Sequence, residues 1–368
     1  MSRVLFAGGG TGGHLYPALA LAAALRRERP ATEVHFVGAL RGVEARVLPA
    51  EKQPHTLLPF EPLRRSRVWE NWKLVPAIVR SSAGLSRLFR TYRPRLVVGT
   101  GGYASAPACA WALMRGVPIA VQEQNSWPGL TTRVMSRWAR QVHLGFPEAR
   151  RLLKPGKRTV VTALGNPIAP PDAALDRLQC RERFGLSADA TVVLVVGGSQ
   201  GARAINEALL EAVSSGLQPG VEILWATGPS HYESIKARLA QMPKLGGVIP
   251  IPYIIEMPKA LASADVAISR AGAMATAELL AWGVPALLIP FPFAAADHQT
   301  HNARALAEAG AALMLVERDL SGERLRQELE RLTADVDLRS RVSRAARERA
   351  RPNAARDIAR ELITLLDE

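Results

Sequence analysis

The sequence is poor in the features that mark secreted, zinc-binding and membrane-spanning proteins. It has two cysteines in 368 residues, Cys109 and Cys180, too few for a disulfide framework or a cysteine zinc site. No apolar run approaches the length of a spanning helix, and Val4 to Ala7 is too short for the core of a signal peptide. We therefore expect a globular protein of the cytoplasm, or one that sits peripherally on the cytoplasmic face of the cell membrane.

Acidic residues are also scarce, but only in the first half. Residues 1–165 hold 25 Lys and Arg against 8 Asp and Glu, a balance of +17, whereas residues 166–368 balance at −3. A basic half favours an anionic partner, and a solvated basic face is the simpler alternative. No nucleic-acid recognition motif accompanies the charge, so nucleic acid is not expected as a partner.

The rest of the sequence alternates apolar, strand-like runs with helical stretches rich in Ala, Leu and Arg. The pattern runs from residue 3 to 163, breaks at the turn-rich segment 165–171, and restarts at 191. This predicts an α/β fold of two doubly wound, Rossmann-like domains with a cleft between them. The predicted domains are 1–165 and 166–350, followed by a C-terminal helix in 351–368 that packs back on the first domain.

Three strand-like runs end in glycine-rich loops, which begin at Gly8, Gly99 and Gly197. A glycine turn between a buried parallel strand and a helix presents backbone N–H groups at the positive end of a helix dipole, which is a ready anion site. Three such loops suggest phosphate chemistry on two substrates.

The first loop matches the dinucleotide fingerprint formally, because Gly8, Gly10 and Gly13 have its spacing. That fingerprint also needs an acidic residue at the end of the second strand, and here that strand ends at Gly38, so a dehydrogenase is disfavoured. His14 stands where a P-loop needs Lys. A histidine facing a crevice suits proton transfer, and capping of a helix start is its structural alternative.

A second constellation lies in the C-terminal half, where Ser269–Ala273 follow the predicted strand 265–268 and open a helix. That helix start suits a phosphate, and Glu278 in its second turn could accept both hydroxyls of a ribose. This is the chemistry that a nucleotide-sugar donor needs. The alternative for Glu278 is a solvated helix residue.

Seven motifs together resemble the MurG family of bacterial glycosyltransferases in order and spacing along nearly the whole chain. They begin at Gly9 (GGTGGH), Gly101 (GGY), Glu123 (EQN), Gly165 (GNP), Gly197 (GGSQGA), Ser269 (SRAGA, continuing to Glu278) and Asp297 (DHQ). The resemblance implies the two-domain GT-B fold. It also implies transfer of N-acetylglucosamine from UDP-N-acetylglucosamine to the C4 hydroxyl of MurNAc in undecaprenyl-pyrophosphoryl-MurNAc-pentapeptide (lipid I), giving lipid II for peptidoglycan synthesis.

The resemblance also implies roles for individual residues. Those expected to bind the donor on the second domain are Ser199, Ile254, Ala273, Met274, Ala275, Thr276, Ala277, Glu278 and Gln299. Those expected to contact the donor sugar or the acceptor from the first domain are Thr11, Gly12, Gly13 and Asn125, and Gly10, Gly101, Gly102 and Tyr103 are the expected loops for the acceptor's pyrophosphate. Ala169 departs from the family, which has an arginine there that contacts the nucleotide; Arg203 is the alternative source.

The expected reaction is an inverting displacement, which needs a base for the acceptor hydroxyl and stabilisation of the departing diphosphate. We expect His14 as the base and Glu123 as the alternative. Because helix starts can carry the leaving charge, no metal or other cofactor is expected. Asp335 and Asp337 have the spacing of a metal motif, but they fall in a helical region and are interpreted as incidental. A transferase with another lipid acceptor and a UDP-N-acetylglucosamine 2-epimerase remain as alternatives.

The basic half also carries an interfacial pattern between residues 60 and 95, where apolar side chains alternate with arginines such as Arg64, Arg65 and Arg67. Trp at headgroup depth beside Arg is typical of a surface that rests on anionic lipid. A core helix with a charged outer face is the alternative. The predicted membrane patch consists of Trp69, Trp72, Val75, Ile78 and Val79.

Overall fold

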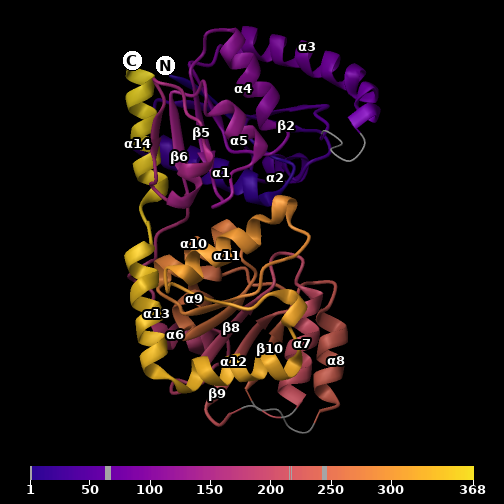
Figure 1. Ribbon diagram of the computed structural model, residues 1–368, viewed down its shortest axis with the longest axis vertical. Coiled ribbons are helices and arrows are strands. Elements are labelled where there is room, and N and C mark those ends of the chain that lie inside the picture. Colours follow the sequence, from indigo (N-terminus) through magenta and orange to yellow (C-terminus); the bar gives the residue numbers. More distant parts are fainter. Residues whose placement is uncertain (1, 63–67, 215, 217, 243–246) are drawn as a thin grey trace. The chain divides into compact units, whose positions relative to one another are not determined.

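The computed structural model describes residues 2–62, 68–214, 216, 218–242 and 247–368 (Figure 1). The predicted Arg64, Arg65 and Arg67 lie outside these residues. The chain forms two compact units, which we treat separately. Unit 1 consists of Met1–Ala169 and Arg351–Glu368, and unit 2 consists of Pro170–Ala350. Each unit contains one parallel sheet with helices, which confirms the predicted α/β fold class.

Unit 1 is built on a seven-stranded sheet of order β3-β2-β1-β4-β5-β6-β7. The strands are β1 (Arg3–Ala7), β2 (Glu33–Ala39), β3 (His55–Leu58), β4 (Leu96–Gly99), β5 (Ile119–Glu123), β6 (Gln141–Leu144) and β7 (Val160–Thr162). The chain builds outward from β1 to β3 and then returns to place β4 on the other side of β1. In such sheets ligands bind where the strand order reverses, beyond the carboxyl ends. The first two glycine loops leave β1 and β4 at that point.

Two helical layers cover this sheet because its strands are apolar on both faces. The helices of the unit are α1 (Gly12–Glu28), α2 (Glu44–Ala50), α3 (Val75–Tyr92), α4 (Ser105–Met114), α5 (Leu130–Met135) and α14 (Ala354–Asp367). One core contains side chains of α1 and α14, and the other contains side chains of α3 and α4. None of the helices in the described ranges is both long enough and apolar enough to cross a membrane.

The C-terminal helix α14 completes the core of unit 1. Its apolar face, with Ile358, Leu362 and Leu366, is buried in the same core as Leu21 and Leu25 of α1. Two ion pairs join the C-terminal end of α1 to α14, since Arg29 lies 2.7 Å from Asp367 and Arg360 lies 2.8 Å from Glu28. Residues from the two ends of the chain therefore share one core.

Unit 2 repeats the arrangement with a six-stranded sheet of order β10-β9-β8-β11-β12-β13. Its strands are β8 (Thr191–Val196), β9 (Val221–Ala226), β10 (Val248–Ile251), β11 (Val266–Ser269), β12 (Ala286–Leu288) and β13 (Leu313–Met314). Its helices are α6 (Arg177–Arg183), α7 (Arg203–Ser214), α8 (Tyr232–Ala240), α9 (Met257–Ser263), α10 (Ala273–Trp282), α11 (His298–Glu308), α12 (Gly322–Ala334) and α13 (Val336–Arg349). The strand order reverses between β8 and β11, and these strands lead into the third glycine loop and the Ser269 motif.

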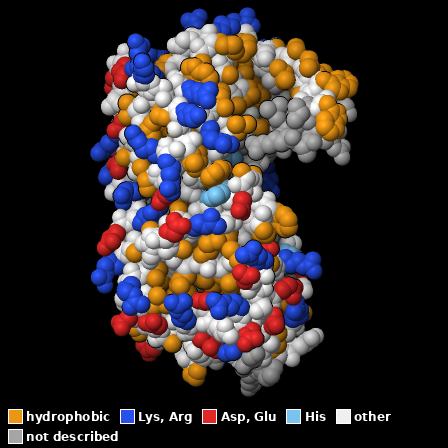
Figure 2. Space-filling model, viewed as in Figure 1, with side chains coloured by type: hydrophobic (Ala, Val, Ile, Leu, Met, Phe, Trp, Pro, Cys, Tyr) orange, Lys and Arg blue, Asp and Glu red, His pale blue; other side chains and the backbone are white. Residues whose placement is uncertain are grey.

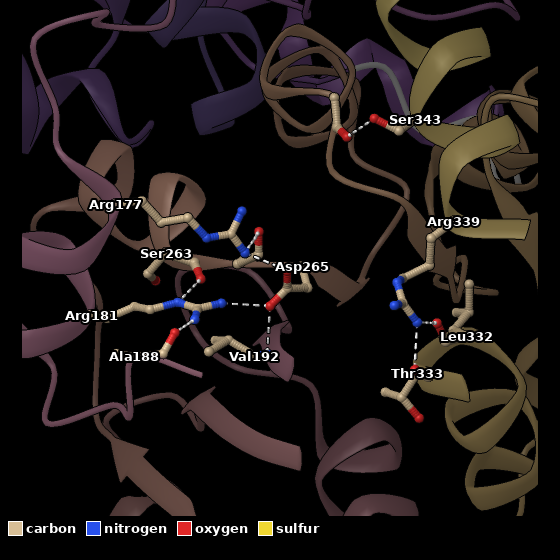
Figure 3. Close-up of polar contacts among 12 residues, drawn as sticks. Arg177, Arg181, Ala188, Val192, Ser263, Asp265, Leu332, Thr333, Arg339 and Ser343 are labelled. Carbon is tan, nitrogen blue, oxygen red and sulfur yellow. Dashed lines mark hydrogen bonds and ion pairs between the residues drawn. The ribbon is translucent and has the colours of Figure 1, made fainter. Parts of the chain in front are cut away.

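Asp265 holds β8 and β11 together at their amino ends. Its Oδ2 accepts hydrogen bonds from Val192 N (2.8 Å) and from Arg181 Nη2 (2.7 Å), and its Oδ1 pairs with Arg177 (Figure 3). Arg181 is buried, and its remaining donors reach the carbonyls of Ser263 and Ala188. The network thereby fixes α6 to the two strands that carry the candidate site at their other ends.

We expect Asp265→Asn to lower the free energy of unfolding by about 3 kcal/mol, because it leaves the buried Arg181 without its counter-charge. Urea denaturation measures this. The matched control is Glu207→Gln, which removes the exposed partner of Arg238 and should change stability by less than about 0.5 kcal/mol. Equal effects of the two substitutions would contradict the structural role of Asp265.

Candidate active site

The first two glycine loops of unit 1 interlock. A Cβ on Gly10 would lie 2.5 Å from Tyr103 Cε1, and a Cβ on Gly102 would lie 2.2 Å from the carbonyl oxygen of Gly9. Both glycines also have left-handed backbones, with φ of 85° and 77°. Only glycine fits this backbone and this close packing. The two loops are therefore packed directly against each other.

His14 lies where the two loops meet, in the first turn of α1. Its Nδ1 is 3.0 Å from Thr11 Oγ1, and its ring packs so closely on Gly101 that a Cβ there would lie 2.7 Å from His14 Cδ2. Thr100, at the end of β4, donates to the His14 carbonyl over 2.7 Å. In the tautomer in which Nδ1 donates to Thr11, Nε2 is the ring nitrogen that accepts a proton. The ring is thus oriented by both loops.

The start of α1 is shaped for a close ligand. Thr11 is the extended N-cap residue, and its side chain makes no capping bond. Gly13 has neither a left-handed backbone nor a close neighbour, since the nearest atom to an added Cβ, Thr11 Oγ1, is 3.8 Å away. Among the described residues, no atom lies close enough to exclude a side chain at Gly13, so the space beside this helix start is open.

Glu123, the alternative base, is buried at the end of β5 and serves its own loop. Its Oε1 accepts from Asn125 N (3.1 Å) and Asn125 Nδ2 (3.3 Å), and its Oε2 accepts from Gly129 N (3.0 Å). Burial raises the pKa of Glu123, and the hydrogen bonds from Thr132, Asn125 and Gly129 oppose that rise. These contacts favour His14 over Glu123 as the base and make Asn125 part of the loop that Glu123 anchors.

The sequence did not assign a role to the buried amides beneath this site. Gln124 Nε2 donates to the Thr100 carbonyl (2.8 Å), and Asn166 Nδ2 donates to the Gln124 carbonyl (3.0 Å). Gln122 completes the group by donating to Asn166 Oδ1. The EQN and GNP motifs are therefore joined by hydrogen bonds from side-chain amides, which hold the ends of β4 and β5 in place.

In unit 2, the third glycine loop runs from Gly197 to the start of α7. Gly201 has a left-handed backbone and packs against the Thr227 carbonyl, which an added Cβ would approach to 2.2 Å. Ser199 and Arg203 are exposed on this loop and at the first residue of α7. Packing against Thr227 fixes the position of the loop, and the predicted phosphate-binding Ser199 lies on its exposed side.

The start of α10 follows β11 directly and resembles the start of α1. Gly272 is the N-cap residue of α10 and has an extended backbone, and no side-chain hydrogen bond caps the helix there. Among the described residues, no atom lies within 4 Å of a Cβ added to Gly272. Ala273, Met274, Ala275 and Ala277 follow in the first turns. Thr276 is buried, and its hydroxyl donates back to the Gly272 carbonyl (3.1 Å).

Glu278 lies one turn further along α10 and is partly buried. In the described part of the chain no hydrogen bond or ion pair to its carboxylate is found. Burial raises the pKa of Glu278 to about 7. A carboxylate that is desolvated without a partner is costly in the folded protein, and it suits a site completed by ligand hydroxyls.

The loops beyond β12 and β10 supply the remaining predicted residues. Gln299 Oε1 accepts from Phe291 N (3.0 Å), so its NH₂ group is the part left to donate. The side chain of Ile254 is buried, at 3% exposed. Arg270, a residue that the sequence did not assign, pairs with Glu317 (2.5 Å) and donates to the Ile289 carbonyl (3.1 Å), bracing the loop ahead of α10.

The predicted membrane patch is exposed on unit 1. It follows the short helix Val68–Leu74 into α3, and Figure 2 shows hydrophobic side chains gathered over α3. Trp69 is 73% exposed and Val79 is 62% exposed. Trp72, Val75 and Ile78 are more than half exposed as well. Large apolar side chains on one helix surface are typical of an interaction site.

Comparisons with known proteins agree with this geometry. Residues 4–144 match the glycosyltransferase family 28 N-terminal domain, and residues 192–362 match the glycosyltransferase family 28 C-terminal domain. A Moorella thermoacetica protein named UDP-N-acetylglucosamine--N-acetylmuramyl-(pentapeptide) pyrophosphoryl-undecaprenol N-acetylglucosamine transferase is 40% identical over 374 residues, covering 99% of each chain. This chain belongs to the MurG family. The crystal structure of Acinetobacter baumannii MurG, 29% identical, superposes with a TM-score of 0.80 and covers 99% of this chain and 100% of that one.

Membership of the MurG family confirms the resemblance and the GT-B fold. The fold alone does not separate the alternatives, because a putative UDP-N-acetylglucosamine 2-epimerase from Listeria monocytogenes, 16% identical, has a TM-score of 0.68 and covers 97% of this chain and 94% of that one. Ala169, which departs from the MurG pattern, is exposed and is the last residue of the first segment of unit 1. The separation of functions therefore depends on the site residues and the close relatives.

Proposed function

We propose that this MurG-family chain transfers N-acetylglucosamine from UDP-N-acetylglucosamine to the C4 hydroxyl of MurNAc in lipid I, giving lipid II. The observation that carries the proposal is the start of α10. An unexplained glycine, Gly272, stands at a helix start, and the unpartnered carboxylate of Glu278 follows in the second turn. A diphosphate bound at Gly272 and a ribose bound at Glu278 would be spaced as they are in a nucleotide.

The donor would bind unit 2 and the reacting hydroxyl would be served by unit 1. The acceptor C4 oxygen attacks the anomeric carbon, the bond from that carbon to the diphosphate oxygen breaks, and its electron pair leaves with UDP. The hydroxyl proton passes to His14 Nε2. The N-terminus of α10 and the third glycine loop stabilise the departing charge, so we propose that turnover needs no metal ion and persists in EDTA.

The test is to incubate the protein with UDP-N-acetylglucosamine in the presence and absence of a soluble lipid I analogue. UDP release that requires the analogue, with a β-1,4-linked disaccharide product, supports the proposal. Transfer to a diacylglycerol in place of the analogue would indicate another acceptor. Formation of UDP-N-acetylmannosamine without acceptor would indicate the epimerase and overturn the proposal.

Gly13 and Gly272, the two glycines with open space at a helix start, allow a test of which unit binds which substrate. Gly272→Ala should raise KM for UDP-N-acetylglucosamine about 10-fold or more and leave KM for the acceptor analogue unchanged, because the added methyl fills ligand space. Gly13→Ala should affect kcat and acceptor KM and spare UDP binding. Steady-state kinetics measures both, with melting temperature as the check on folding. The opposite pattern of KM changes would contradict the assignment.

The lipid-linked acceptor also gives the exposed patch a function. We propose that Trp69, Trp72, Val75, Ile78 and Val79 rest on the anionic, cytoplasmic surface of the cell membrane and hold the protein there peripherally. The support is the combination of exposed apolar side chains with the +17 balance of residues 1–165.

Ile78→Glu should weaken binding to vesicles that contain phosphatidylglycerol by about 10-fold, because it removes apolar contact and repels the surface. Vesicle co-sedimentation at low and high salt measures this. The matched control is Ile255→Glu, which changes an even more exposed isoleucine of unit 2 and should leave vesicle binding as it is. Loss of binding in both variants would contradict a membrane surface at α3.

A further inference from the structure

The first glycine loop is hydrogen-bonded to the side-chain carboxylate of Glu44. Glu44, the first residue of α2, is fully buried. Both of its oxygens accept from Gly10 N, over 3.1 Å and 2.9 Å, and Oε1 also accepts from Ala39 N over 2.7 Å. One side chain thus binds the amide of the loop after β1 and the amide at the end of β2.

Three glycines around Glu44 leave the space that its side chain occupies. A Cβ would lie 2.2 Å from Oε1 if added to Gly9, 2.5 Å from Cγ if added to Gly38, and 2.2 Å from Oε2 if added to Gly42. Gly38 and Gly42 do not have left-handed backbones, so their packing against Glu44 is what excludes a side chain. Three segments of unit 1 are therefore shaped around one carboxylate.

The carboxylate changes what the loop can bind. Hydrogen bonds from amides to a carboxylate are stronger than those between neutral groups, and Glu44 also lies in the first turn of α2, where the helix dipole favours an anion. A phosphate that approached Gly10 would find its amide already bonded and would face a like charge. The Gly10 amide is thus not a phosphate contact in this structure.

We propose that Glu44 is a positioning residue for His14. By holding Gly10 and Ala39, its carboxylate fixes the loop that leads into Thr11 and His14, and it directs the acceptor's pyrophosphate away from the first loop toward Gly101 and Gly102. This inference rests on the proposed function, in which His14 takes the proton. It assigns the first loop to the placement of the base and leaves anion binding to the second loop.

Glu44→Gln tests the proposal because it keeps the shape and replaces one acceptor oxygen with a donor that opposes Gly10 N–H. We expect kcat to fall about 10-fold or more while KM for UDP-N-acetylglucosamine stays unchanged, since the donor binds unit 2. The matched control, Glu33→Gln, removes an exposed carboxylate that pairs with Arg3 at the other end of the same sheet, and it should retain wild-type kcat.

A second variant perturbs Glu44 without replacing it. Gly42→Ala places its methyl against Oε2 and should lower kcat in the same way as Glu44→Gln. In a Glu44→Ala background the clash is gone, so adding Gly42→Ala should cause no further loss of kcat. Losses that multiply in the double variant would show that Gly42 acts independently of Glu44 and would overturn the proposal.

The NMR signals of the His14 ring provide a readout that does not depend on turnover. We expect one sharp set of Cε1–H and ring nitrogen signals in the wild type, and shifted or exchange-broadened signals in Glu44→Gln but not in Glu33→Gln. Unchanged His14 signals with wild-type kcat would overturn the inference, as would a fall in kcat caused only by a lower melting temperature. If the wild type transferred no sugar, the proposed function would fail while the His14 signals still decided the role of Glu44.

Discussion

Replacing His14 with alanine is expected to lower kcat about 100-fold to 1,000-fold and to leave UDP-N-acetylglucosamine binding almost unchanged. A positioned general base contributes a factor of this size, and we propose that the donor binds the other unit. The ring has the support that a base needs, because Thr11 contacts Nδ1 and Gly101 packs on its edge. Steady-state kinetics with the acceptor analogue, beside calorimetric UDP binding, measures the two effects separately.

The matched control for His14 is His231→Ala, which changes a histidine before α8 of unit 2 and should keep wild-type kcat. Glu123→Gln serves as the comparison between the two candidate bases. Because the Glu123 carboxylate is engaged by Asn125 and Gly129, we expect this variant to lower stability more than it lowers kcat. Near-normal turnover of His14→Ala with a 100-fold loss in Glu123→Gln would reverse the assignment.

Glu278→Gln is expected to weaken UDP-N-acetylglucosamine binding about 100-fold, because two hydrogen bonds from the ribose to a charged acceptor are reduced to weaker ones. In the wild type, donor affinity should depend on pH. Since burial raises the pKa of Glu278 to about 7, the carboxylate that the ribose needs is lost as pH falls through that value. Donor KM should rise about 10-fold per pH unit below 7 and level off above 8.

For the stability of the folded protein, we expect Glu278 to have the opposite dependence on pH. The folded protein binds a proton on Glu278 between pH 4.5 and about 7 that the unfolded chain releases, so this residue costs stability as pH rises through that window. Glu278→Gln should therefore raise the free energy of unfolding at pH 8 by up to about 3 kcal/mol while it impairs donor binding. Chemical denaturation at pH 5 and 8 measures this, with exposed Glu233→Gln as the control. A variant that is destabilised at pH 8 would contradict the burial of an unpartnered charge.

The sequence predicted the architecture well because the central strands of both sheets are short apolar runs that end in glycine. Two elements of unit 1, β3 and α4, carry no comparable signal at their ends. His55–Leu58 is an edge strand without alternation, and Ser105–Met114 contains Pro107 and follows a loop read only as an anion site. Edge strands and helices that begin inside a functional loop are fixed by packing, which a local pattern does not report.

The candidate site was predicted where the backbone sets the chemistry and missed where burial does. Helix starts at Gly13 and Gly272 follow from strand-glycine-helix spacing, so their residues could be named in advance. The role of Glu44 could not, because an acidic residue two positions after Gly42 gives no sign that it points inward to Gly10. The structure also buries the side chains of Thr276 and Ile254, and their position in the motif does not tell which way these side chains face.

Helix α14 has a consequence for how the protein is made. Its residues are synthesised after those of unit 2, and until then the face of α1 that contains Leu21 and Leu25 lacks its cover. Unit 2, whose residues are contiguous, can fold before α14 is made, whereas the core of unit 1 closes only when α14 has been added. A chain cut before α14 would thus keep the core of unit 2 and expose an apolar face of unit 1, which favours aggregation and proteolysis.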